Sequence, residues 1–333
     1  MDDPILQVQD LCAEFVTPDG IVSAVNGVSL NLQRGRTLVL TGESGSGKTS
    51  IGLAILGLLP HPGRITSGSI VFKGRDLMTM PAEELRRVRG KEIAIVFQDA
   101  STGLNPVLSV GQQVEEIITN HLDVSRKEAR RRSVEVLAEM GLPEADEVAK
   151  RYPFQLSGGM AQRVMIAIAT ALKPQVLILD EPTSALDVTV QAAILEDLSR
   201  LQREQDIAIL WITHDFGVVA QIANSVAVMY AGYVVEESDA QTLFSRPRHP
   251  YTWSLLASRP RWDREEHRPL AVIKGTPPSL IDLPDQCPFV PRCPKATSVC
   301  RSDPMPPLAQ IDLPGHQAAC YNPVYQDELA VEN

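Results

Sequence analysis

The sequence GESGSGKT at Gly42–Thr49 fits the phosphate-binding pattern G-x-x-x-x-G-K-[ST]. The apolar, β-branched run at 37–41 before it predicts a buried strand, and the run at 50–56 after it predicts the first turns of a helix. Glycines let successive backbone N–H groups of such a loop point inward, and the following helix adds the positive end of its dipole. The stretch therefore predicts a nucleotide site in which Lys48 reaches the β- and γ-phosphates and Thr49 contacts Mg²⁺.

Composition and charge restrict the kind of protein this can be. The chain has 333 residues, enough for one large domain and a smaller appendage. Its net charge of −10 gives no support to a nucleic-acid-binding surface, and we interpret the basic run at 126–132 as a solvated helix face. The start at 1–4 is acidic without a signal-peptide pattern, and no apolar stretch of about 20 residues occurs. We therefore expect a cytoplasmic protein that binds no nucleic acid and reaches a membrane only through partners.

The N-terminal region reads as strands. Short apolar runs at 5–8, 22–25 and 28–32 predict three of them, with a turn at 17–20. Phe15 lies just before that turn, where an aromatic ring can stack on adenine. Its position alone fits a core phenylalanine equally well.

Two later strands are predicted to end in polar residues. The uninterrupted apolar run at 176–179 predicts a parallel strand covered on both faces, and it ends in Asp180 and Glu181. Open α/β sheets place their ligands at the carboxyl ends of such strands. Asp180 can then bind Mg²⁺, directly or through water, and Glu181 can orient or deprotonate the attacking water. The strand predicted at 207–213 ends in the same way, which aims His214 at phosphate.

Ser157-Gly158-Gly159 precedes a helical stretch and offers a second helix N-terminus for an anion, although by itself this pattern is also a common cap. Beyond Arg246 the chain becomes rich in proline and cysteine, which breaks up regular structure. We therefore divide the chain into domains at 1–245 and 246–333.

Taken together and in this order, the motifs over residues 5–240 resemble those of the ATP-binding cassette (ABC) ATPases. The resemblance implies an α/β P-loop core with an antiparallel β subdomain and a helical subdomain at about 99–170. It implies hydrolysis of ATP in a head-to-tail dimer, between the P-loop of one subunit and the signature Leu156–Gly159 of the other. Met160 departs from the Gln that many cassettes carry, but Ser157 and Gly159 are intact, so we expect activity. The implied residues are Phe15, Gly42, Ser44, Gly45, Ser46, Gly47, Lys48, Thr49, Ser50, Gln98, Ser157, Gly158, Gly159, Asp180 and Asp187 for ATP, Thr49, Gln98 and Asp180 for Mg²⁺, and Glu181 and His214 for catalysis.

The tail narrows the resemblance. The segments 248–252, 275–278 and 287–294 look like the C-terminal extension of dipeptide/oligopeptide and nickel importer ATPases. This implies a peripheral subunit on the cytoplasmic face of the membrane, with a homologous second ATPase subunit, two permeases and an extracytoplasmic substrate-binding protein as partners. Closing and reopening of the ATPase dimer would power peptide uptake. Nickel import, a soluble cassette ATPase acting on DNA or ribosomes, and an iron–sulfur regulatory protein are the alternatives.

Four cysteines crowd the tail at Cys287, Cys293, Cys300 and Cys320, spaced C-x₅-C-x₆-C-x₁₉-C. In a reducing compartment such a group indicates metal rather than disulfides. Inert buried thiols and zinc are alternatives, but zinc sites usually contain a tight C-x₂₋₄-C pair, which is absent. Prolines after Cys287 and Cys293, together with the family resemblance, favour a [4Fe–4S] cluster in a structural role. His316 is a substitute ligand at most, and we expect it at the surface.

Overall fold

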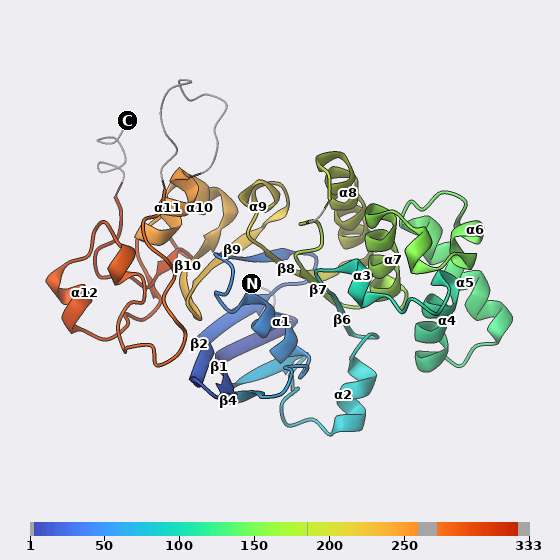
Figure 1. Ribbon diagram of the computed structural model, residues 1–333, viewed down its shortest axis with the longest axis horizontal. Helices are drawn as coiled ribbons and strands as arrows, with labels where there is room; N and C mark the ends of the chain where they lie inside the picture. The colour runs from blue at the N-terminus through green and yellow to red at the C-terminus, as the bar shows by residue number, and fades with distance from the viewer. Residues whose placement is uncertain (1–2, 185, 259–271, 326–333) are drawn as a thin grey trace.

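The computed structural model describes residues 3–184, 186–258 and 272–325. Its main element is an eight-stranded sheet that crosses the molecule (Figure 1). In spatial order its strands are β11 (Ala309–Gln310), β12 (Gln317–Ala318), β10 (Tyr233–Asp239), β9 (Ser225–Tyr230), β3 (Thr37–Thr41), β8 (Ala208–Thr213), β7 (Val176–Asp180) and β6 (Ile93–Val96). The strands from β9 to β6 are parallel, and β10, β12 and β11 add antiparallel pairs at one edge.

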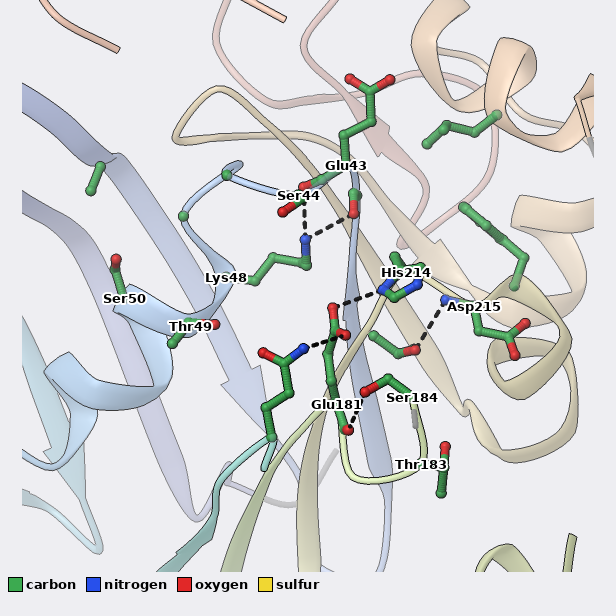
Figure 2. Close-up of a pocket in the computed structure, with 18 of the residues that line it drawn as sticks. Glu43, Ser44, Lys48, Thr49, Ser50, Glu181, Thr183, Ser184, His214 and Asp215 are labelled. Carbon is green, nitrogen blue, oxygen red and sulfur yellow. Dashed lines mark hydrogen bonds and ion pairs between the residues drawn. The ribbon is translucent and has the colours of Figure 1, made fainter. Parts of the chain in front are cut away.

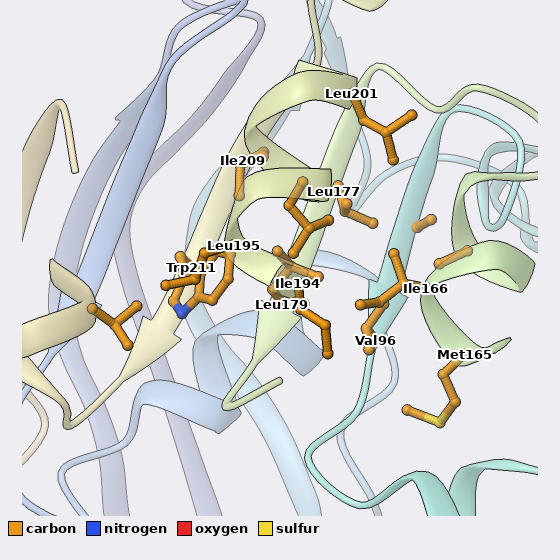
Figure 3. Close-up of a cluster of buried hydrophobic side chains, with 14 of the residues drawn as sticks. Val96, Met165, Ile166, Leu177, Leu179, Ile194, Leu195, Leu201, Ile209 and Trp211 are labelled. Carbon is orange, nitrogen blue, oxygen red and sulfur yellow. The ribbon is translucent and has the colours of Figure 1, made fainter. Parts of the chain in front are cut away.

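The parallel strands are buried on both faces, as their continuous apolar runs predict. Every residue of β3, β7 and β8 is buried. Helix α1 (Lys48–Ile55) contacts β7 and β8, and α9 (Phe216–Ile222) contacts β3 and β8. On one face the core lies between the sheet and helices α7 (Gly158–Thr170) and α8 (Val188–Gln205), where Ile166, Leu195 and Trp211 are almost fully buried (Figure 3). This packing fixes the carboxyl ends of the strands relative to the P-loop.

A separate antiparallel sheet is formed near the N-terminus. Its strands are β2 (Gly20–Leu32), β1 (Leu6–Thr17), β4 (Gly63–Phe72) and β5 (Arg75–Asp76), in that order. The prediction of three short strands was wrong, because 5–32 forms two long strands joined at the predicted turn. Shifts of register between Val8 and Glu14 interrupt the alternation of apolar and polar residues, which made long strands look like short ones.

Helices occupy the segment between β6 and β7. They are α3 (Ala100–Gly103), α4 (Val110–His121), α5 (Arg126–Glu139), α6 (Ala145–Lys150) and α7, with a 3₁₀ turn at Pro153–Gln155, while α2 (Ala82–Val88) precedes β6. The basic run lies on α5, where Arg131 and Arg132 each approach Glu128 at 2.7 Å. The side chains of Arg131 and Arg132 are 56% and 40% exposed, which confirms the solvated helix face, and their hydrogen bonds lower the pKa of Glu128 to about 2. The predicted fold class, with its antiparallel and helical parts, is therefore confirmed.

The tail is continuous with the core sheet. After α10 (Ala240–Ser245) and α11 (Pro250–Ala257) come a 3₁₀ turn at Val290–Arg292 and α12 (Ser298–Ser302), and β12 pairs with β10. Contrary to expectation, His316 is buried, because its Nε2 lies 2.8 Å from Oε1 of Glu236. Glu236 is itself buried and also accepts the backbone N–H groups of Arg248 and His249. Within the described parts of the chain, no helix combines the length and apolar character needed to cross a bilayer.

Candidate nucleotide-binding and hydrolysis site

The P-loop wraps tightly against its neighbours. Gly42 and Gly47 have φ of 148° and 100°, which side chains rarely adopt. A Cβ on Gly42 would lie 2.1 Å from the carbonyl oxygen of Met229, and one on Gly47 would lie 2.0 Å from that of Ala24. Both positions therefore require glycine, and the loop conformation follows directly from the sequence.

Lys48 lies folded into this loop (Figure 2). Its Nζ donates to the carbonyl oxygens of Gly42 and Glu43, at 2.8 Å each. Burial lowers the pKa of Lys48, while the nearby carboxylates of Glu181, Asp180 and Glu43 oppose that effect. The ammonium group is thus held at the start of α1, where the backbone N–H groups favour an anion.

A pocket of about 1150 Å³ opens beside the loop. Strands, the P-loop and the segment after β8 all contribute to its wall (Figure 2). It brings together most of the residues predicted for the site: Phe15, Gly42, Ser44, Gly45, Gly47, Lys48, Thr49, Ser50, Gln98, Glu181 and His214. Ser46 is buried behind the loop, with its Oγ accepting from Nζ of Lys48 at 3.3 Å.

Asp180 ends β7 beneath this pocket and is 4% exposed. Burial raises its pKa, and a hydrogen bond with Thr49 and the charge of Lys48 counteract the rise. Its Oδ1 is buried without a hydrogen-bond partner among the described residues. An unpartnered carboxylate oxygen next to a hydroxyl is the donor set that Mg²⁺ prefers, so Asp180 and Thr49 fit that ion.

Glu181 is held from two sides in the pocket (Figure 2). Its Oε1 lies 2.8 Å from Nδ1 of His214, and its Oε2 accepts from Nε2 of Gln98 at 3.2 Å. Its backbone has φ of 46°, a strained conformation for a residue with a side chain, and such strain gathers at functional positions. Gln98, predicted as an Mg²⁺ ligand, donates to the candidate base in this structure.

The signature residues lie elsewhere on the surface. Ser157 caps α7 by accepting the N–H of Met160, and Ser157 and Gly158 are exposed. Asp187 caps α8 by accepting the N–H groups of Thr189 and Val190 at 3.1 and 3.0 Å. Neither the signature 157–159 nor Asp187 lines the P-loop pocket, so one chain does not assemble all the predicted residues in one place.

Sequence reasoning missed the side chains that hold Glu43, a variable position of the P-loop pattern. Both Nη atoms of Arg292 contact the Glu43 carboxylate, at 2.6 and 3.0 Å, and the Tyr251 hydroxyl accepts its N–H at 2.8 Å. Tyr251 and Arg292 belong to the tail segments that carried the family resemblance. Their local pattern gives no sign of a contact with a loop about 200 residues earlier.

The four tail cysteines line one small cavity of about 20 Å³. Burial raises the pKa of Cys287 to about 11 and that of Cys320 to about 12, and the backbone N–H groups of Phe289 and Asn322 counteract the rise. In the described ranges, no three His, Cys, Asp or Glu residues lie close enough together to hold a metal ion. The predicted cluster site is therefore not preformed: its ligands share a cavity that has room for about one water molecule.

Comparison with known proteins agrees with this geometry. The family model "ABC transporter" matches residues 25–184, and "Oligopeptide/dipeptide transporter, C-terminal region" matches 235–300. The oligopeptide transport ATP-binding protein OppD of Escherichia coli K12 is 48% identical over 97% of this chain and 94% of its own length. The dipeptide transport ATP-binding protein DppD of Bacillus subtilis is 45% identical over 98% of this chain and 96% of its own.

Solved structures agree as well. A dimeric post-hydrolysis state of the ATP-binding cassette MJ0796, bound to ADP and Pi, superposes with a TM-score of 0.64 at 29% identity, covering 71% of this chain and 98% of that one. The structure of cbiO1 from Clostridium perfringens gives 0.62 at 30% identity, covering 74% and 92%. The chain therefore belongs to the ABC transporter family, as an ATPase of the group that carries the oligopeptide/dipeptide transporter C-terminal region.

Proposed function

We propose that this ATPase powers the uptake of di- or oligopeptides from the cytoplasmic face of the membrane. Two permeases would form the path, an extracytoplasmic protein would deliver the peptide, and a homologous ATPase subunit would complete the dimer. The names of the relatives, which refer to oligopeptide and dipeptide transport, support peptide over nickel as cargo. The observation that carries the ATPase part is the Glu181 carboxylate, held between Gln98 and His214 in the pocket of Lys48.

In the proposed mechanism, Glu181 orients the water that attacks the γ-phosphate and accepts its proton. His214 and Gln98 fix the two oxygens of that carboxylate, which reduces the reorganisation needed during the reaction. Lys48 balances charge on the β- and γ-phosphates, and Phe15 stacks on the adenine at the pocket wall. Thr49 and Asp180 would hold Mg²⁺, which would neutralise phosphate charge.

A second ATPase subunit is needed to complete this site. The N-terminus of α7 at Ser157 and Gly158 is exposed and lies outside the P-loop pocket of its own chain. Such a helix end favours an anion. Closure of a head-to-tail dimer would bring it to the γ-phosphate of the partner, and hydrolysis would let the dimer reopen. The dimeric state of the related cassette MJ0796 supports this arrangement.

A groove beside Gln98 supports contact with the permeases. Its volume is about 730 Å³, and its wall includes Phe154, of which 75% is exposed, together with Pro106 and Leu156. Apolar side chains exposed around a groove are typical of protein interaction sites. Because Gln98 lines both this groove and the nucleotide pocket, movement of a permease element in the groove would reach Glu181.

The proposal is tested by reconstitution. The purified chain alone should hydrolyse ATP slowly, and adding the partner ATPase and permeases in lipid should raise the rate. Peptide delivered by the binding protein should raise it further, and Ni²⁺ should not. Hydrolysis by a monomeric chain at the full rate of the complex would contradict the composite site. Stimulation of hydrolysis by Ni²⁺ and not by peptide would show that the transported substrate is nickel.

We also propose that the four tail thiols hold a [4Fe–4S] cluster in a structural role, with zinc as the competing ligand. The support is the donor set: four thiols on one cavity, with the backbone N–H groups of Phe289, Lys295 and Asn322 directed at three of the sulfurs. N–H donors of this kind stabilise sulfur in its anionic form. A cluster would require this cavity of about 20 Å³ to widen, because it has room for about one water molecule.

A further inference from the structure

The C-terminal extension reaches back to the start of the P-loop, and the contact centres on Glu43. Each polar group of this residue is occupied: its carboxylate by Arg292, its N–H by the Tyr251 hydroxyl, and its carbonyl oxygen by Lys48. Two of these three partners come from the extension. The segment of P-loop next to Lys48 is therefore held by residues more than 200 positions later in the chain.

Burial and several hydrogen bonds fix the side chain of Arg292 in this position. Its side chain is 5% exposed, and besides the two bonds to Glu43 it donates to the hydroxyl of Tyr230 at 3.1 Å and to the carbonyl oxygen of Lys274 at 3.2 Å. Tyr230, Tyr251 and Phe289 pack against one another with ring centroids 4.6 to 5.3 Å apart, and the guanidinium lies 5.8 and 6.0 Å from the ring centroids of Tyr230 and Phe289. A guanidinium that is buried, packed and bonded through both Nη atoms keeps one geometry and a permanent charge.

The positive charge of Arg292 affects nucleotide binding through Glu43. Glu43 lines the nucleotide pocket, and its carboxylate is 25% exposed and points away from Lys48 (Figure 2), yet its charge still raises the pKa of that amine. An acidic group beside an anion site opposes anion binding unless a cation neutralises it. Arg292 supplies that cation from the side of Glu43 facing the extension.

We propose that Arg292 tunes the ATP site electrostatically: by neutralising Glu43 beside the P-loop, it makes nucleotide affinity depend on the C-terminal extension. The inference concerns the ATPase itself and depends neither on the cargo nor on the ligand of the thiol cavity.

The test is a double-mutant cycle in the full-length chain, with ATP affinity measured by calorimetry. Arg292→Gln leaves Glu43 unneutralised and should weaken ATP binding about tenfold. Glu43→Gln removes the charge that Arg292 offsets and should bind ATP at least as tightly as the wild type. The double variant Arg292→Gln/Glu43→Gln should return to within about threefold of Glu43→Gln, a rescue that a purely structural role would not produce.

The matched control is Arg248→Gln. Arg248 is also buried and ion-paired in the extension, to Asp312, but makes no contact with the P-loop. It should lower the melting temperature and leave ATP affinity unchanged. The proposal is overturned if Arg292→Gln binds ATP as tightly as the wild type, or if the double variant does not regain affinity. It is also overturned if Arg248→Gln loses as much ATP affinity as Arg292→Gln. If Arg292→Gln does not fold, weaker ATP binding by Glu43→Gln alone still overturns it.

Discussion

Nδ1 of His214 lies 2.8 Å from Oε1 of Glu181, which joins the ends of two neighbouring parallel strands across the nucleotide pocket. The other carboxylate oxygen accepts from Gln98, at the end of a third strand. The candidate base is therefore held by side chains from the segments that follow β8 and β6. A group positioned in this way is ready to orient a water molecule without further rearrangement.

Glu181→Gln tests this assignment. The variant should retain ATP binding, but its turnover should fall by a factor of about 10²–10⁴, because an amide cannot accept the proton of water. It should also trap a closed dimer with the partner ATPase. Steady-state hydrolysis by the assembled complex and ATP binding by the chain are the measurements, with the exposed Glu84→Gln on α2 as the control.

His214→Ala extends the same test. If His214 acts by holding Glu181, His214→Ala should slow turnover of the otherwise wild-type chain. In the Glu181→Gln background the same change should slow turnover further by less than about threefold. Near-normal hydrolysis in Glu181→Gln, or fully additive losses in the double variant, would show that the two residues do not form a unit.

Phe15→Ala should weaken ATP binding about tenfold, the loss expected when one ring that stacks on a base is removed. Phe15→Trp should retain affinity, because it keeps an aromatic face at the pocket wall. Val16→Ala is the control, since Val16 is the next residue of β1, is 44% exposed and does not line the pocket. Equal affinity in Phe15→Ala and Val16→Ala would mean that Phe15 is a packing residue.

Glu237 predicts a pH dependence of stability. Burial raises its pKa from 4.5 to about 7 in the folded chain. Between these values the folded state binds a proton that the unfolded state has released, so stability falls as pH rises and the penalty is complete above about pH 7. Glu237→Gln should therefore raise the melting temperature by roughly 5 °C at pH 8 and leave it unchanged near pH 4.5.

Thermal unfolding at the two pH values checks this prediction. The exposed Glu204→Gln on α8 is the control, and its melting temperature should differ from that of the wild type by the same small amount at both pH values. A gain in Glu237→Gln that is equal at pH 4.5 and pH 8 would exclude titration of Glu237 as the cause.

Anaerobic purification tests the thiol cavity. A cluster predicts brown protein with about four irons and four sulfides per chain. Cys287→Ser, Cys293→Ser, Cys300→Ser and Cys320→Ser should each lose the colour, and Cys12→Ser should keep it, because Cys12 lies on β1 and accepts the N–H of Gly27 instead. Colourless protein with one zinc per chain would show a zinc site instead of a cluster. Metal-free protein with an ordered tail would show that the four cysteines are inert buried thiols.

Local sequence was sufficient for the P-loop and for the ends of the parallel strands. Gly42 and Gly47 impose a backbone that closes on itself, and the apolar run before Asp180 belongs in a sheet buried on both faces. The partners of these residues lie within a few positions or on the neighbouring strand. Their geometry therefore follows from backbone preferences and from burial, which the residue types record directly.

Tertiary packing alone decided the rest. Arg292 and Glu43 are 249 positions apart, and His316 and Glu236 are 80 apart, so no periodicity links them. His316 reads as a surface residue until the buried Glu236 is seen to need a partner, and four widely spaced cysteines come together in one cavity. Such contacts depend on how the extension docks against β9, β10 and the P-loop. A buried charge selects its partner only once the folded chain has brought the two together.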